Sequence, residues 1–582
     1  MSNIVPFTTD LGVEKSEIEN APILTNVSLP SGYALFRDGV YQIINDDMDE
    51  TPILICSPFR INATFSDQTG KGWGALIAVR NRDAMWNEMP VTHERLVRYP
   101  AEVIGNLVNA GLELAPDRKS KERLLALIKI WKPLTRLTTV TRMGWVDDTH
   151  SAFVAGDHVI GTTKVLPLIN VPAGLTSTGS IDSWKQHLGA KCCGNQNMIL
   201  AVCLALSGPL LLVLGVNGGG LHFRGASSSG KTTLLNLAAS VWGSPQLVRQ
   251  WRATSNGLEG IAAALNDMLL PLDEIAEISA RALPETIYML ANGVGKVRMN
   301  RDAQLSDTSQ WRLALISSGE ISIEEKLQEG GRGHMAGQEV RLLDIEADNR
   351  AHGVFDELHG TSNGASFADH IKQASKSNHG ALGRAFASKL IEQIESGDFS
   401  KQLEVLKCFQ ADAIACISGD VDGQVSRVVH RFGVLALAGH IATGWGLTGW
   451  GEREALEHAE AAFLEWHDRR FGSKQQDLAK FIPPLQQFLA ANMAAFPVAG
   501  APASSEPILG WQDPSRIYLT PESWHRVYPG ILGSKAAQAL IAANLMVQGD
   551  GGRQMCKGPR GIPGRPRLFT LNRKKVTAYK VY

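Results

Sequence analysis

One short segment of the chain combines the residue types that bind phosphate groups. It reads Gly225-Ala-Ser-Ser-Ser-Gly230-Lys231-Thr232 and follows the spacing of a phosphate loop, with an apolar strand expected before it and a helix after it. Glycines let backbone N–H groups surround phosphates, the lysine neutralises β/γ charge, and the hydroxyl ligates Mg²⁺. We therefore expect ATP and Mg²⁺ as cofactors, Lys231 as a catalytic residue and Thr232 as a metal ligand. The residues expected to contact the nucleotide are Gly225, Ala226, Ser227, Ser228, Ser229, Gly230, Lys231, Thr232 and Thr233.

A pair of acids follows the next apolar run. Residues 268–272 read Met-Leu-Leu-Pro-Leu and end in Asp273-Glu274. In hydrolysing phosphate-loop enzymes, the first acid of such a pair holds Mg²⁺ and a nearby group orients the attacking water. We expect Asp273 to be a metal ligand with a catalytic role and Glu274 to polarise the water. The pair favours hydrolysis over simple nucleotide holding.

Two adjacent serines end a further expected strand, at residues 311–318. If this strand lies between the phosphate-loop strand and the acid strand, Ser317 or Ser318 can reach the γ-phosphate or the water. We expect Ser318 to be catalytic. The alternative is an ordinary helix cap, for which serine is favoured.

Several arginines are candidates to stabilise transition-state charge. Arg341 begins the following expected strand, and we favour it over Arg332 as a finger that reaches the nucleotide of a neighbouring subunit. The alternative is a strand-end arginine paired to a surface acid. Arg427 and Arg431 stand four residues apart on an expected helix and are candidates for a second sensor, with a salt-bridged helix face as the alternative.

Basic residues gather in two places. Lys296, Arg298 and Arg301 lie in an expected hairpin between the acid strand and the sensor strand, and we expect them to bind single-stranded DNA in the pore of a ring. The alternatives are a solvated hairpin or contacts to a neighbour's nucleotide. From Arg553 to Tyr582 there are nine Lys/Arg residues and no acid, so this end can contact phosphates or simply be solvated.

The elements that position these residues read as an α/β phosphate-loop NTPase with an AAA+-like parallel sheet. Apolar strands and helices alternate between the phosphate loop and the arginine candidates. We expect an N-terminal α+β domain, a helical lid and a basic, winged-helix-like C-terminal domain. The expected boundaries are 1–180, 181–350 for the core, 351–496 for the lid, 497–510 for a linker, and 511–582.

Composition excludes several classes of protein. The 582 residues carry a net charge of -1, which excludes a globally basic nucleic-acid coat. The seven cysteines lack any CxxC pair, and the N-terminus lacks a secretory signal, so we expect a cytoplasmic protein. The charge-free residues 198–216 could suggest a membrane span, but Gly208-Pro209 interrupts them; we favour a buried helix pair and expect no membrane association.

The motifs together resemble a known family. The segments FRGASSSGKTTLLNLAASVWG, WRATSNGLEGIAAALND, LLPLDEI, MLANGVGKVRMNRD, WRLALISSGE and QEVRLLDI are similar to those of a P-loop AAA+ family described as a domain of unknown function in phages and mobile elements. The resemblance extends from about residue 33 to 571. Members include self-loading chromosome-cassette helicases, whose motor is similar to that of minichromosome-maintenance helicases. One departure is the Ser-Ser ending of the sensor strand, where these helicases usually have Asn.

The resemblance implies a hexameric ring and supports the roles given above to Lys231, Thr232, Asp273, Glu274, Ser318 and Arg341. We expect an ATP-dependent DNA helicase or translocase of a mobile element or prophage, acting as a homohexamer in DNA replication with replication partners of the same element. The alternatives are an AAA+ regulatory or remodelling ATPase without unwinding activity, and a DNA-packaging or defence motor. Polarity, subunit number and ATP against GTP preference are not encoded in any motif that we recognise.

Overall fold

The computed structural model describes residues 29–36, 38–46, 49–162, 164–296, 308–330, 337, 340–417, 421–500 and 508–579. The chain divides into two compact units, of which one comprises Met1–Asp412 with Asp422–Glu460 and the other Ala413–Val421 with Ala461–Tyr582. Each unit is described by itself. The five boundaries expected from the sequence remain predictions.

The N-terminal part of the first unit is built mainly of β-strands. A three-stranded antiparallel sheet contains β1 (Tyr33–Leu35), β2 (Val40–Asp46) and β3 (Asp49–Cys56). A five-stranded sheet follows in the order β11-β7-β4-β5-β6, and a short sheet has the order β10-β9-β8. The bounds are β4 Phe59–Asp67, β5 Gly74–Arg80, β6 Trp86–Thr92, β7 Arg136–Val140, β8 Gly144–Trp145, β9 Ala152–Ala155, β10 His158–Gly161 and β11 Val165–Pro167.

Three helices lie between β6 and β7: α2 (His93–Arg98), α3 (Pro100–Asn109) and α4 (Ser120–Ile130). Their apolar residues, among them Leu107, Leu124 and Leu127, share one buried cluster with Ile61, Ile77 and Val79 of the strands. The helices therefore cover one face of the five-stranded sheet, as the helical spacing of their leucines indicates.

The centre of the first unit is a five-stranded parallel sheet of order β13-β14-β15-β12-β16. Its strands are β12 (Gly219–Arg224), β13 (Arg249–Gln250), β14 (Met268–Asp273), β15 (Leu313–Gly319) and β16 (Leu342–Glu346). β15 lies between β12 and β14, which is the condition under which the sequence analysis allows its terminal serines to reach the nucleotide. The predicted α/β fold with a parallel sheet is confirmed, and the near-continuous burial of β12, β14 and β15 is typical of such sheets.

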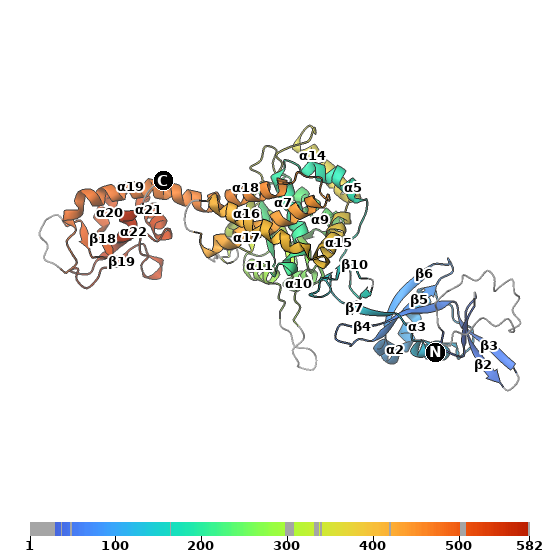
Figure 1. Ribbon diagram of the computed structural model, residues 1–582. Helices are drawn as coiled ribbons and strands as arrows, with labels where there is room; N and C mark the ends of the chain where they lie inside the picture. Colours follow the sequence, from blue (N-terminus) through green and yellow to red (C-terminus); the bar gives the residue numbers. More distant parts are fainter. Residues whose placement is uncertain are drawn as a thin grey trace. The chain divides into compact units, whose positions relative to one another are not determined.

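Helices pack on this sheet: α7 (Gln196–Ser207) and α9 (Lys231–Ser240) contact β14 and β15, and Figure 1 shows both helices in the centre of the first unit. α7 is buried along its whole length and contacts α9 and α17 (Gly423–Gly444). Gly208-Pro209 separates α7 from the short α8 (Leu210–Val213), of which Leu210 and Leu211 are buried, so the charge-free segment forms two helices. In the described part of the chain, no helix is both long and apolar enough to cross a membrane.

The remaining helices of the two units follow in sequence, and their bounds are α5 Ile181–Trp184, α6 Ala190–Cys192, α10 Ser255–Ala264, α11 Leu283–Asn292, α12 Ile323–Glu329, α14 Gly364–Ser377, α15 Ala381–Glu395, α16 Gln402–Ala415, α18 Glu454–His467 and α19 Ser473–Asn492. α14 packs against α9, directly behind the phosphate loop.

The second unit contains a four-stranded antiparallel sheet of order β17-β18-β20-β19. Its elements are β17 (Gly510–Gln512), β18 (Arg516–Leu519), α20 (Pro521–Val527), α21 (Ile531–Ala542), β19 (Cys556–Lys557), β20 (Arg567–Asn572) and α22 (Arg573–Ala578). The ring of Trp524 stacks on that of Phe569 at 4.5 Å between centroids, which joins α20 to β20 in one core.

Candidate functional site

The phosphate loop joins the buried strand β12 to α9. Gly230 precedes the helix with φ of +106°, and a Cβ added there would lie 2.8 Å from Val354, so both conformation and space require glycine. Lys231 is 8% exposed, and its ammonium donates to the carbonyl oxygens of Gly225 at 2.8 Å and Ala226 at 2.6 Å. The only cation of the loop is thus held inside the loop, at the N-terminus of a ten-residue helix.

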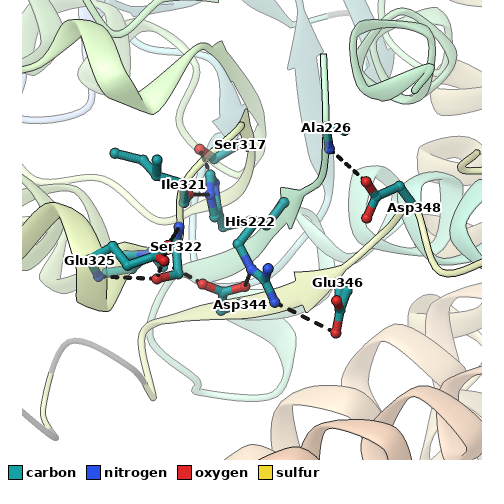
Figure 2. A network of polar contacts seen from close by, with 11 residues as sticks. His222, Ala226, Ser317, Ile321, Ser322, Glu325, Asp344, Glu346 and Asp348 are labelled. Carbon is teal, nitrogen blue, oxygen red and sulfur yellow. Dashed lines mark hydrogen bonds and ion pairs between the residues drawn. The ribbon is translucent and has the colours of Figure 1, made fainter. Parts of the chain in front are cut away.

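A segment that follows β16 supports the loop from outside. The carboxylate of Asp348 accepts the Ala226 N–H at 2.6 Å, and Figure 2 shows this side chain pointing to the loop. Farther along, the Val354 N–H donates to the Ser229 carbonyl at 3.0 Å. Asn197, at the start of α7, donates through its amide to the Val354 carbonyl at 3.1 Å and to that of Ala347 at 2.9 Å. The loop conformation therefore depends on residues more than a hundred positions away.

The structure brings Thr232, Asp273 and Ser318 together at the carboxyl end of the parallel strands. The Thr232 hydroxyl donates to Asp273 Oδ2 at 3.2 Å, and the Ser318 hydroxyl donates to Asp273 Oδ1. The Glu274 N–H points to Ser318 Oγ at 3.4 Å. Glu274 has φ of +58°, a region that is unfavourable for a non-glycine residue, and its carboxylate accepts the Ala276 N–H at 3.3 Å. One serine therefore contacts both members of the acid pair.

The adjacent serine belongs to a different, fully buried group. Ser317 Oγ accepts the Trp251 indole N–H at 2.9 Å and lies 2.9 Å from His222 Nδ1. His222 Nε2 lies 3.0 Å from the Ile321 carbonyl (Figure 2). Burial lowers the pKa of His222, so its imidazole is neutral at pH 7. Ser317 is thus engaged in holding β15 to β12 and to the turn after β15.

A second polar group links β12 to β16. Arg224, the last residue of β12, lies 3.3 Å from Asp344 and 3.6 Å from Glu346 of β16. The other carboxylate oxygen of Asp344 accepts the Ile323 N–H at 3.1 Å, at the start of α12. These contacts fix the positions of the strand ends from which the phosphate loop and the Asp348 segment emerge.

The residues present fit ATP and Mg²⁺. Mg²⁺ prefers hard oxygen ligands, and the Thr232 hydroxyl and the Asp273 carboxylate supply two of them side by side. The hydroxyl groups of Ser229 and Thr233 are buried and lack a hydrogen-bond partner among the described residues. Such unpaired groups are costly unless a ligand or water satisfies them. Both flank the Gly230-Lys231-Thr232 turn, where a phosphate group would lie.

Two of the arginine candidates lie at the opposite edge of the sheet. Arg341 immediately precedes β16; its guanidinium donates to Asn292 at 2.9 Å and lies 4.4 Å from the Tyr288 ring. Arg431 of α17 donates to the Gly218 carbonyl at 3.1 Å, at the start of β12. Burial and, secondarily, the charge of Arg341 lower the pKa of Arg431 to about 10. Within the described residues, neither guanidinium contacts a carboxylate.

The other residues that the sequence analysis named as candidates do not lie together. Arg427 is exposed on α17, one turn before Arg431. Lys296 lies at the base of the expected hairpin, where Gly295 and Ser309 are joined by a backbone hydrogen bond of 2.8 Å, and its ammonium lies 3.2 Å from Glu285. Arg298, Arg301 and Arg332 fall outside the described residues.

Four supporting residues escaped the sequence analysis: His222, Trp251, Asp348 and Asn197. Only His222 carried a local signal, because a histidine in the middle of an apolar strand is unusual. The other three look like ordinary loop or helix-start residues, and only the fold shows their contacts.

The chain is similar to known proteins at the level of both sequence and fold. Residues 33–310 match the family described as "Domain of unknown function (DUF927)", a range that includes the phosphate loop and the acid pair. No curated protein matches the chain.

Among solved structures, "SCCmec type IV Cch - active helicase" has a TM-score of 0.61 at 20% sequence identity, over 94% of this chain and 99% of that chain. "The X-ray structure of Inhibitor Bound to JCV Helicase" has a TM-score of only 0.18 at 12% identity, over 41% of this chain and 65% of that chain, and carries no argument. The Cch likeness therefore shows a shared fold over nearly the whole chain. The match of residues 33–310 to the DUF927 family confirms the resemblance to a domain of unknown function that was found in the sequence.

Proposed function

We propose that this protein is an ATP-dependent DNA helicase or translocase of a mobile genetic element or prophage, acting as a homohexameric ring in DNA replication. The observation that carries the proposal is the meeting of Thr232, Asp273 and Ser318 beside Lys231, at one edge of the parallel sheet. The fold neighbour whose description reads "active helicase" directs the proposal to DNA.

Each residue of this edge has a distinct proposed role. Lys231 moves from the loop carbonyls to neutralise the charge of the β/γ-phosphates, and the loop N–H groups bind their oxygens. Thr232 and Asp273 hold Mg²⁺, which supplies charge neutralisation at the transferred phosphoryl group. Glu274 orients and polarises the attacking water. Ser318 keeps the acid pair in place through its two contacts and bonds the water or the γ-phosphate when its hydroxyl rotates.

The positions of Arg341 and Arg431 favour action on a neighbouring subunit. Both lie at the amino ends of β16 and β12, whereas the phosphate loop follows the carboxyl end of β12. Six strand residues separate these edges by about 17 Å, too far for either side chain to reach the nucleotide of its own chain. Two adjacent guanidinium groups that contact no carboxylate can stabilise the negative charge that develops at the nucleotide of a neighbouring subunit.

The finer parts of the proposal concern the other domains. We propose that residues 351–496 act as a helical lid and that residues 511–582 form a winged-helix-like domain, with a linker at 497–510. Lys296, Arg298 and Arg301 would grip single-stranded DNA in the pore, in the cytoplasm. Because Lys296 is paired to Glu285 at 3.2 Å, it contributes to DNA binding only after that ion pair opens.

The test is ATP hydrolysis by the full chain with and without single-stranded DNA. Hydrolysis should rise with DNA and be lost in Lys231→Ala. Lys376→Ala, which removes an exposed lysine of α14, is the matched control and should behave as the wild type. Hydrolysis that survives in Lys231→Ala contradicts the site. Hydrolysis that DNA neither stimulates nor requires favours the alternative, an AAA+ remodelling ATPase without unwinding activity.

A further inference from the structure

The loop between β19 and β20 carries an unusual concentration of positive charge. Residues 557–567 read Lys-Gly-Pro-Arg-Gly-Ile-Pro-Gly-Arg-Pro-Arg, and we name this segment the basic loop. All four of its cations are exposed, and it contains no acid and no aromatic residue. Lys557, Arg560 and Arg565 line a shallow hollow of about 600 Å³ together with residues 561–564. The basic loop belongs to the second unit and is separate from the nucleotide site.

The basic loop is held in one conformation by its own contacts. The side chain of Ile562 is 1% exposed and packs with Tyr518 and Leu568 under the loop. Across its base, the Gly558 N–H donates to the Pro566 carbonyl at 2.9 Å. Three prolines further restrict its backbone. A surface that is already ordered loses little entropy when it binds, which favours a binding function.

Arg565 is in a costly conformation. Its φ of +45° lies in the region that favours glycine, so its backbone is strained. Its guanidinium is directed by a hydrogen bond from Nε to the Gly558 carbonyl at 2.9 Å. The strained backbone conformation thus places the Arg565 guanidinium at the hollow, which Lys557 and Arg560 also line.

The charge of the basic loop is not balanced locally. Within the described residues, none of its four cations contacts a carboxylate, whereas exposed lysines elsewhere commonly do, such as Lys389 with Glu392 at 2.7 Å and Lys401 with Asp398 at 2.7 Å. The next acid before the loop is Asp550, and none follows it to the end of the chain. A rigid, unbalanced cluster of this kind attracts a polyanion.

We propose that the basic loop binds the phosphate backbone of duplex DNA without reading its sequence. Sites for single strands combine cations with aromatic side chains on which bases stack, and the basic loop has none. Duplex DNA needs no such platform, because its phosphates are presented on the outside at regular spacing. The three cations at the hollow can contact about three phosphates.

The expected effect follows from counterion release. The binding constant for duplex DNA varies with salt to the power of about -0.9 for each phosphate contact, so one contact contributes about eightfold at about 0.1 M salt. Removing two cations should therefore weaken binding about 60-fold and reduce the slope of log K against log salt by about 2. Neither change depends on nucleotide hydrolysis.

The experiment is fluorescence anisotropy with the full chain, no nucleotide, and labelled duplex or single-stranded DNA of equal length. Arg560→Ala/Arg565→Ala should lose duplex affinity and salt slope as stated and retain most single-strand affinity. Arg560→Lys/Arg565→Lys should largely restore duplex binding, which separates charge from folding. Arg526→Ala, which removes an exposed arginine of α20 outside the basic loop, is the matched control. It should change duplex affinity by less than the factor of about eight expected for one phosphate contact.

Unchanged duplex affinity in the double alanine variant overturns the proposal, as does an equal loss for duplex and single strand. Failure of the lysine variant to restore binding also contradicts it, because it points to a structural role. Absence of unwinding by the wild type would affect only the proposed function, since this assay measures duplex binding alone.

Discussion

Two adjacent serines of β15 allow a sharp test of the proposed hydrolytic site. Ser317 and Ser318 are both fully buried, yet their hydroxyl groups serve different partners. Ser318 donates to the Asp273 carboxylate and accepts the Glu274 N–H at 3.4 Å. Ser318→Ala removes a hydrogen bond to a charged group, which is worth about 1.5–3 kcal/mol. We expect kcat for ATP to fall about 10- to 150-fold, because the acid pair loses its support.

Nucleotide affinity should change little in Ser318→Ala, because the contacts of Lys231 within the loop do not involve Ser318. The control is Ser317→Ala, one position away. It leaves the Trp251 indole N–H without its partner, so we expect a loss of about 1–3 kcal/mol in the free energy of unfolding. Its kcat per folded molecule should stay near that of the wild type.

The assay is steady-state ATP hydrolysis, combined with urea unfolding to count folded molecules and with titration of a fluorescent ATP analogue for affinity. An unchanged kcat in Ser318→Ala refutes the reasoning. An equal loss of kcat in both variants also refutes it, since the effect would then come from β15 as a whole and not from the contact to Asp273.

Three further predictions address the surroundings of the site. Because burial lowers the pKa of His222, the unfolded chain binds a proton at a pH at which the folded chain does not. The free energy of unfolding should therefore fall below about pH 6.5, by up to about 1.4 kcal/mol per pH unit, until the pKa of the folded state is reached. His222→Gln should reduce the dependence of the free energy of unfolding on pH, measured by urea unfolding between pH 7.5 and 5.5. An unchanged pH dependence contradicts the role given to His222. Asp348→Ala leaves the Ala226 N–H without its hydrogen-bond acceptor, so it should raise KM for ATP several-fold more than Asp348→Asn does. Equal KM values in the two variants would show that the hydrogen bond between Asp348 and Ala226 is dispensable. Lys231→Ala and Arg341→Ala subunits can be mixed in equal amounts. About a quarter of randomly formed interfaces then pair an intact loop with an intact arginine, so the rate of hydrolysis should recover to about a quarter of that of the wild type. A mixture whose rate stays at that of the single variants contradicts action in trans.

The sequence indicated the residues whose roles depend on local backbone geometry. The phosphate loop is recognisable because its glycines, lysine and hydroxyl are contiguous, and Asp273-Glu274 because an apolar strand leads directly into the pair. These features need little information beyond the segment in which they occur. The placement of β15 between β12 and β14 was only a condition in the sequence analysis, and the assembled sheet shows that it is met.

Contacts between distant segments were beyond sequence reasoning. The choice between Ser317 and Ser318 depends on which side of β15 faces the acids, since neighbouring strand residues point to opposite faces. Trp251 and Ser317 are 66 positions apart, and Ala226 and Asp348 are 122 positions apart. No local pattern links such pairs, so their contacts appear only when the strands are assembled.

Arg431 illustrates the same limit. Its spacing from Arg427 is equally typical of a salt-bridged helix face, but the fold packs it, half-buried, against the start of β12. A Cβ added at Gly219 would lie 2.1 Å from the guanidinium, so the small residues there are what admit the arginine. The helical pattern shows that two arginines share a face and does not show what covers that face.

The central claim is that ATP hydrolysis at the Lys231 site drives the separation of DNA strands. The most direct measurement is strand displacement from a forked DNA duplex by the full chain, followed by fluorescence in the presence and absence of ATP and Mg²⁺. The account predicts displacement that requires both cofactors, persists in Lys376→Ala and disappears in Lys231→Ala. Hydrolysis of ATP by the wild type without any displacement, or displacement that survives in Lys231→Ala, would contradict it.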